Sequence, residues 1–222
     1  MVRQMGHMVY LILICCCSVR AGEVVLPADQ IVKAADIQSG VVIHLGCGDG
    51  SLTSALAEHG SFLVQGLAKD ASTVEQARAN LQAGKRYGVQ LSVDHSEFSA
   101  LPYANNLANL VVIDNLASAL KSGLKLSEIQ RVLCPNGVLM AGPEAEQVKA
   151  GLAGGGFQNV TSVTVGGQLW IRAQKPKPKD TGEWNHWRCN AGDNPVTQDA
   201  RVGYPKQLHW VAGPNLTRGH KP

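Results

Sequence analysis

The sequence lacks several features that would place it in a narrow class. Its apolar run at residues 8–17 covers about half of the roughly 20 residues that a membrane-spanning helix needs. Cysteine is scarce: outside that run, only Cys47, Cys134 and Cys189 occur, and they stand far apart. This spacing excludes a disulfide framework and a zinc site, so we expect free thiols and no bound metal.

Charge is also low and points to no particular partner. Charged residues make up 17% of the 222 residues, and the formal net charge is +3. Most of the excess lies in a tail whose single lysines and arginines are spread among prolines and tryptophans, as in an ordinary solvated segment. We therefore expect no nucleic-acid or membrane partner. The apolar content of 45% is ordinary for a globular protein with one core.

The N-terminus has the pattern of an export signal. A positively charged flank precedes the apolar run, and Val19 and Ala21 follow it as small residues. The pattern resembles a secretory signal at residues 1–21, cut after Ala21, and predicts a periplasmic or secreted protein. A lipoprotein signal using a cysteine at 15–17 is the alternative. It fits less well because Ile14 stands where a small residue is expected.

Residues 24–173 alternate between strand-like and helix-like patterns. Short apolar runs predict buried strands at 40–45, 61–67, 89–93, 108–114 and 137–141. Helical patterns occur at 51–60, 72–84, 124–137 and 145–156. Ser72 and Glu75 have the spacing of a capping box. Runs at 159–165 and 168–173 flank two glycines, which is a hairpin signal. The alternation predicts a Rossmann-like α/β fold, with a mostly parallel seven-stranded sheet, helices on both faces and an antiparallel terminal hairpin.

Glycines at 46, 48 and 50 follow the strand at 40–45 directly. Ligands bind beyond the carboxyl ends of such strands, and a loop without Cβ atoms lets them approach the backbone. The dinucleotide pattern G-x-G-x-x-G would need Gly or Ala at 51, where this chain has Ser51. The pattern G-C-G-x-G after an apolar strand resembles motif I of the class I S-adenosylmethionine-dependent methyltransferases.

Two further segments carry the same resemblance. Leu101 and Pro102, with Glu97 four residues before the leucine, look like the segment that leads into the family's fourth strand. Residues 128–137, EIQRVLCPNG, resemble the family pattern E-x-x-R-V-L-x-P-G-G. The resemblance covers nearly all of residues 24–173. It implies the methyltransferase fold, S-adenosylmethionine as the small-molecule cofactor and an unidentified methyl acceptor.

The resemblance also implies a set of cofactor-binding positions, at two of which this chain departs from the family. His44 stands where family members have an acid that helps to bind the methionine end. Ala68 stands where they have the acid that holds the ribose diol. Glu97 is retained, and the backbone of Phe98 would contact adenine with it. The expected cofactor site comprises His44, Gly46, Cys47, Gly48, Gly50, Ala68, Glu97, Phe98 and Asp114. No catalytic residue can be assigned from the sequence.

The C-terminal part has a different composition. Residues 174–183 contain KPKPK and read as an extended linker. Residues 184–222 hold three of the four tryptophans and resemble the opening segment of a pyrroloquinoline-quinone-type β-propeller repeat protein. About one strand's worth of propeller cannot bury its own surface, so we expect no independent domain here. The rest of the propeller would belong to a longer chain.

Two functions therefore remain open. The first is a methyltransferase of unknown substrate, with cofactor binding weakened by the loss of two acids. The second is an exported, non-catalytic module of methyltransferase fold, attached to a quinoprotein-like propeller. Export favours the second, because S-adenosylmethionine is made in the cytoplasm.

Overall fold

The computed structural model describes residues 28–201, except 83, 85, 144, 185, 187, 188, 190, 193–195, 197 and 198. The predicted signal segment and most of the predicted propeller-like segment lie outside the described residues. Within the part that is described, no helix is both long and apolar enough to cross a membrane.

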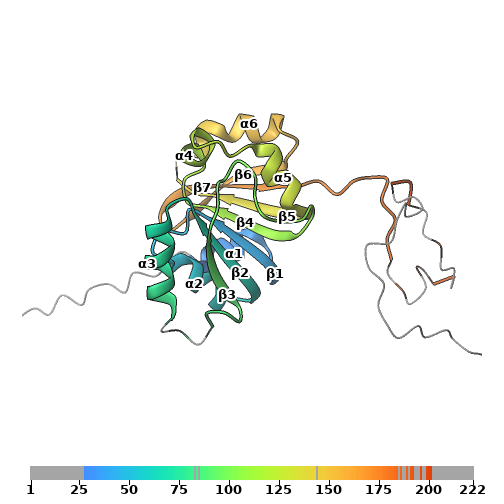
Figure 1. Ribbon diagram of the computed structural model, residues 1–222. Helices are drawn as coiled ribbons and strands as arrows, with labels where there is room; N and C mark the ends of the chain where they lie inside the picture. Colours follow the sequence, from blue (N-terminus) through green and yellow to red (C-terminus); the bar gives the residue numbers. More distant parts are fainter. Residues whose placement is uncertain are drawn as a thin grey trace, which may run out of the picture.

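Seven strands form one sheet in the spatial order β3-β2-β1-β4-β5-β7-β6 (Figure 1). From β3 to β5 neighbouring strands are parallel, and β7 is antiparallel to both β5 and β6. The predicted Rossmann-like sheet with its antiparallel hairpin is therefore confirmed. Because β7 inserts between β5 and β6, the first strand of the hairpin forms the sheet edge. The strands are β1 Ser39–Leu45, β2 Ser61–Ala68, β3 Leu91–His95, β4 Ala108–Ile113, β5 Leu133–Ala141, β6 Gln158–Val165 and β7 Gln168–Gln174.

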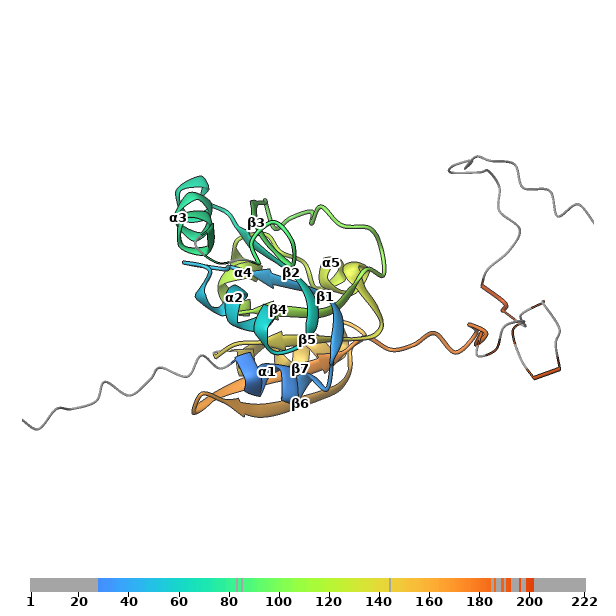
Figure 2. The same ribbon diagram turned by 90° about the horizontal axis from the view of Figure 1, so that it is seen from below.

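Helices cover both faces of the sheet (Figure 1). One face packs against α1 Ala28–Ala35, α2 Ser51–Glu58 and α3 Ala71–Gln82. The other packs against α4 Leu116–Lys121, α5 Leu126–Val132, the 3₁₀ helix η1 Ala145–Val148 and α6 Lys149–Gly154. Figure 2 places α1 beside β5, β6 and β7, with α3 at the far end of the sheet. The central strands are buried on both sides, as their continuous apolar runs require.

Several predicted boundaries were wrong. The α3 helix begins at Ala71, so Ser72 lies inside its first turn and does not precede it as a cap. The α5 helix ends at Val132, and residues 135–137, predicted to close it, belong to β5. A register shift between β4 and β5 accommodates them, with Asn136 at a positive φ of 64°. The helix predicted at 145–156 is divided into η1 and α6. The short helices α1 and α4 were not predicted.

Glu128 and Arg131 of α5 hold the loop between β3 and β4. The Leu101 N–H donates to Glu128 Oε1 at 2.7 Å, and Arg131 Nη2 donates to the Leu101 carbonyl at 3.0 Å. Arg131 Nη1 also donates to the Tyr103 carbonyl at 2.7 Å. The hydrogen bond from Arg131 lowers the pKa of Glu128. The two family-like segments are thus joined directly, and their junction fixes the loop that carries Phe98.

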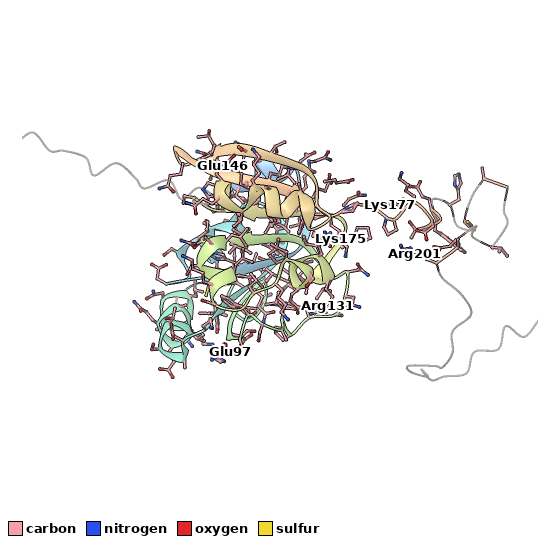
Figure 3. All side chains as sticks on the ribbon, turned by 90° about the horizontal axis from the view of Figure 1, so that it is seen from above. Glu97, Arg131, Glu146, Lys175, Lys177 and Arg201 are labelled. Atoms are coloured by element: carbon pink, nitrogen blue, oxygen red, sulfur yellow. The ribbon has the colours of Figure 1, made fainter. Side chains whose placement is uncertain are left out.

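Lys175, which directly follows β7, connects the end of that strand to α5, to the start of β5 and to the loop between β3 and β4. Its Nζ donates to the carbonyls of Gln130 and Leu133, each at 2.6 Å, and to Asn106 Oδ1 at 2.7 Å. Burial lowers the pKa of Lys175. Figure 3 shows Lys175 at the edge of the sheet domain, while Lys177 and Arg201 lie on the segment that follows. The first two residues of the predicted linker at 174–183 therefore belong to the body: Gln174 ends β7, and Lys175 is anchored by its side chain.

Candidate cofactor pocket

A pocket of about 310 Å³ opens beyond the carboxyl ends of β1, β2 and β4. This is the position at which ligands bind in sheets of this type. Its charged lining residues are Lys69, Asp70 and Asp114. The full lining is Leu45, Gly46, Gly48, Ala68, Lys69, Asp70, Thr73, Phe98, Ile113, Asp114, Asn115, Ser118, Ala119 and Ser122.

The three glycines of the loop serve two different purposes. Gly46, Gly48 and Gly50 all have positive φ, at 83°, 51° and 85°, which favours glycine at each. A Cβ added to Gly46 or Gly48 would meet no atom within 4 Å, so these two face open space in the pocket. A Cβ on Gly50 would lie 2.8 Å from the Leu81 side chain. Gly50 therefore allows the loop to pack against α3, and does not line the pocket.

His44 lies beneath the pocket and is completely buried. Its Nε2 is 3.1 Å from Asp114 Oδ1, and its Nδ1 is 2.8 Å from Thr53 Oγ1. A carboxylate oxygen only accepts hydrogen bonds, so Nε2–H donates to Asp114, and Nδ1 shares a hydrogen bond with the Thr53 hydroxyl. The side chain predicted to touch the cofactor instead connects α2 to the end of β4.

Cys47 also points away from the pocket. It is buried, and the site of a Cβ on Gly66 would lie 2.9 Å from Cys47 Cβ. Burial raises the pKa of the Cys47 thiol to about 11, so it stays protonated at neutral pH. The backbone N–H groups of Gly46 and Cys47 donate to the Leu67 carbonyl at 2.9 and 3.2 Å. Cys47 thus fixes the loop on β2 and stays inert as a nucleophile.

The end of β2 carries a cation that sequence reasoning missed. Ala68 lines the pocket with a buried side chain. Lys69 Nζ lies 3.4 Å from Glu97 Oε2 and 3.5 Å from the Ser122 carbonyl. Glu97 itself is exposed at the molecular surface (Figure 3). It is not one of the residues that line the pocket. Its carboxylate is partly neutralised by Lys69.

Helix α4, which forms one wall of the pocket, was not predicted from the sequence either. Asn115 caps this helix by accepting a hydrogen bond from the Ser118 N–H at 2.8 Å. Ser118 and Ser122 then line the pocket from successive turns. Asn115, two residues after β4 and three residues before Ser118, was the available cap signal. Of the predicted cofactor residues, the pocket brings together Gly46, Gly48, Ala68, Phe98 and Asp114.

Comparisons with known proteins agree with this geometry. Residues 42–137, less than half of the chain, match the family model described as a methyltransferase domain. An S-adenosylmethionine-dependent methyltransferase from Aquifex aeolicus superposes with a TM-score of 0.56 at 19% identity, over 68% of this chain and 90% of that one. The fold is that of the class I methyltransferases. A comparison with curated protein sequences gave no significant match.

Two more solved structures share the methyltransferase fold. A methyltransferase of the same cofactor class from Methanosarcina mazei has a TM-score of 0.52 at 15% identity, with 67% of this chain and 98% of that chain covered. The [4+2]-cyclase SpnF has a TM-score of 0.56 at 14% identity, with 68% of this chain and 80% of SpnF covered. Together with the family match, these comparisons indicate S-adenosylmethionine as the cofactor.

The pocket fits that cofactor in its general chemistry. The space over Gly46 and Gly48 is a cradle that any Cβ there would fill. Phe98 and Ile113 supply apolar lining, and Asp70 and Asp114 outnumber Lys69 among its charged groups. A sulfonium cofactor carries a net positive charge at neutral pH, so an excess of carboxylates favours its binding.

Proposed function

We propose that this domain binds S-adenosylmethionine in the pocket beyond β1, β2 and β4 and is a methyltransferase of a substrate still to be identified. The observation that carries the proposal is the open glycine loop: Gly46 and Gly48 face the pocket with left-handed backbones and no atom where a Cβ would lie. Such a loop serves a ligand that approaches the backbone closely.

The residues of the pocket divide the binding tasks by their chemistry. The glycine loop would lie along the ligand, and the backbone of Phe98 would contact its adenine, as the family resemblance implies. Asp70 and Asp114 would offset its positive charge. When bound, the cofactor supplies an electrophilic methyl group on sulfur. The chain's own contribution is to orient it and to shield it from water.

We propose further that cofactor binding is weak. Ala68 provides no carboxylate for the ribose diol, and His44 is buried beneath the pocket rather than lining it. One charge-assisted hydrogen bond contributes about 1.5–3 kcal/mol, so losing the ribose contact weakens binding roughly tenfold to a hundredfold.

A binding module without turnover is the second candidate. The Asn115 side chain, at the end of β4, is engaged in capping α4, and Asp114 is engaged by His44. Because these contacts fix both side chains in place, the end of β4 is suited to holding a ligand. The same fold also carries other chemistry, since SpnF is a [4+2]-cyclase. In this candidate the domain is exported and precedes a quinoprotein-like propeller, whose opening segment residues 184–222 resemble.

Calorimetric titration of the purified chain with S-adenosylmethionine tests the proposal. We expect saturable binding with micromolar or weaker affinity. Nanomolar binding would refute the weakening, and no binding at millimolar cofactor would refute the function. Incubation with methyl-labelled cofactor and pools of small-molecule acceptors then separates the candidates: incorporated label supports the methyltransferase, and binding without transfer supports the module.

A further inference from the structure

We propose that Asp114 binds the α-amino group at the amino-acid end of the cofactor, and that His44 is the positioning residue that holds Asp114 for this task. The inference rests on the proposed function and deepens it. In this chain the carboxylate that position 44 lacks is supplied from the neighbouring strand.

Strand pairing brings Asp114 to the glycine loop. Leu45, the last residue of β1, pairs with Ile113, the last residue of β4. Gly46 and Asp114 are therefore the next residues on two adjacent strand ends, and both line the pocket. Asp114 keeps 46% of its side chain exposed, so its carboxylate is open to a ligand.

One oxygen of Asp114 is already oriented. Oδ1 accepts the hydrogen bond from His44 Nε2, while no residue in the described part of the chain donates to Oδ2. The imidazole cannot rotate freely, because Thr53 holds its other nitrogen and the ring is completely buried. A carboxylate with one fixed and one free oxygen is preorganised for an ammonium group.

The order of the strands decides which end of the ligand meets Asp114. Phe98 follows β3, and the Ser96 N–H donates to the Ala68 carbonyl at 3.0 Å, so Phe98 and Ala68 lie on the β3–β2 side. The family resemblance implies that this side takes the adenosine. The β4 side, where Asp114 stands, is then left for the amino-acid end.

The other nearby carboxylates are less suited to this role. Asp70 lies on the β2 side of the pocket, just before α3. Asp49 does not line the pocket, and its two oxygens accept hydrogen bonds from the N–H and hydroxyl of Ser51 at 2.9 and 2.8 Å. Glu97 is paired with Lys69.

Two ligands that differ only in the amino-acid end give the test. S-adenosylhomocysteine carries the α-amino group, and 5′-methylthioadenosine has the same thioether nucleoside without it. In calorimetric titrations of the full chain, Asp114→Asn should weaken the binding of S-adenosylhomocysteine about tenfold or more. The same substitution should leave the affinity for 5′-methylthioadenosine unchanged. The matched control is Asp70→Asn, which also removes one pocket charge but should not change the ratio of the two affinities.

A double-mutant cycle tests the positioning role of His44. His44→Phe should lower the affinity for S-adenosylhomocysteine when Asp114 is present, and it should have no effect on that affinity in the Asp114→Asn background. Equal loss for both ligands with Asp114→Asn would overturn the inference, whether or not His44→Phe folds. A natural chain that binds neither ligand would instead refute the proposed function.

Discussion

The backbone N–H of Leu101 donates to Glu128 Oε1 at 2.7 Å, across 27 residues of sequence. Leu101 belongs to the loop that carries Phe98 to the pocket, and Glu128 belongs to α5. Only 14% of the Glu128 side chain is exposed, and Arg131 pairs with the same carboxylate. The loop is therefore held by a charged acceptor that water cannot easily replace.

Glu128→Gln should lower the free energy of unfolding by about 1–3 kcal/mol, because the network loses its negative charge and one of the two acceptor oxygens at position 128. Urea unfolding followed by circular dichroism measures the change. The control is Glu146→Gln on η1, whose ion pair with Lys149 is exposed and should contribute less than about 1 kcal/mol. Equal losses in the two variants would mean that the Glu128 network does not hold the loop.

The same carboxylate should make stability depend on pH. Arg131 lowers the folded-state pKa of Glu128 below its ordinary value of 4.5, so the folded state binds the proton less readily than the unfolded state. The stabilisation is fully present above that ordinary value and is lost as the pH falls through the lowered pKa. Glu128→Gln should therefore flatten the acid limb of the stability curve. An unchanged limb in urea titrations at acid pH would contradict this assignment.

Ala68→Asp should tighten binding of S-adenosylhomocysteine about tenfold, by restoring a charged acceptor for the ribose diol. Ala68 lines the pocket at the end of β2, next to Lys69, whose charge would help to keep the new carboxylate ionised. Calorimetry measures the affinity, and Ala68→Asn controls for side-chain size. If the two variants bind alike, position 68 does not face the ribose.

Gly66→Ala should destabilise the protein by about 1–3 kcal/mol through overpacking. The new Cβ would lie 2.9 Å from Cys47 Cβ and 3.2 Å from Thr53 Cγ2, so it would displace the glycine loop and the residue that holds His44. Gly154→Ala in α6 is the matched control, since its Cβ would meet nothing within 4 Å. Thermal unfolding compares them. If Gly66→Ala unfolds at the same temperature as the natural protein, the glycine loop can move without loss of stability.

Export is a separate proposal, carried by the N-terminal pattern alone. Protein produced in a secreting host should begin at Gly22, after removal of residues 1–21. N-terminal sequencing of the mature protein tests this, and Ala21→Arg should block the cleavage. A cytoplasmic product that retains Met1 would contradict export and strengthen the case for a working methyltransferase.

The strands and the position of the pocket could be read from sequence because both depend on local patterns. Apolar runs marked the buried strands, and the glycines marked the loop beyond β1. The role of His44 could not be read in this way. Its hydrogen-bond partner Asp114 is 70 residues away and meets it only when β1 pairs with β4. Helix α4 was missed because six residues give too little periodicity to recognise.

The placement of β7 between β5 and β6 bears on how the chain is made. In this sheet β6 has β7 as its one neighbouring strand, yet β6 precedes β7 in the sequence. During synthesis β6 leaves the ribosome first and must wait, unpaired, until residues 168–174 have followed it. A ribosome stalled before that point would carry a five-stranded sheet with β5 as an open edge. Completion of the sheet, and protection of the nascent chain from edge-to-edge aggregation, thus depend on its last strand.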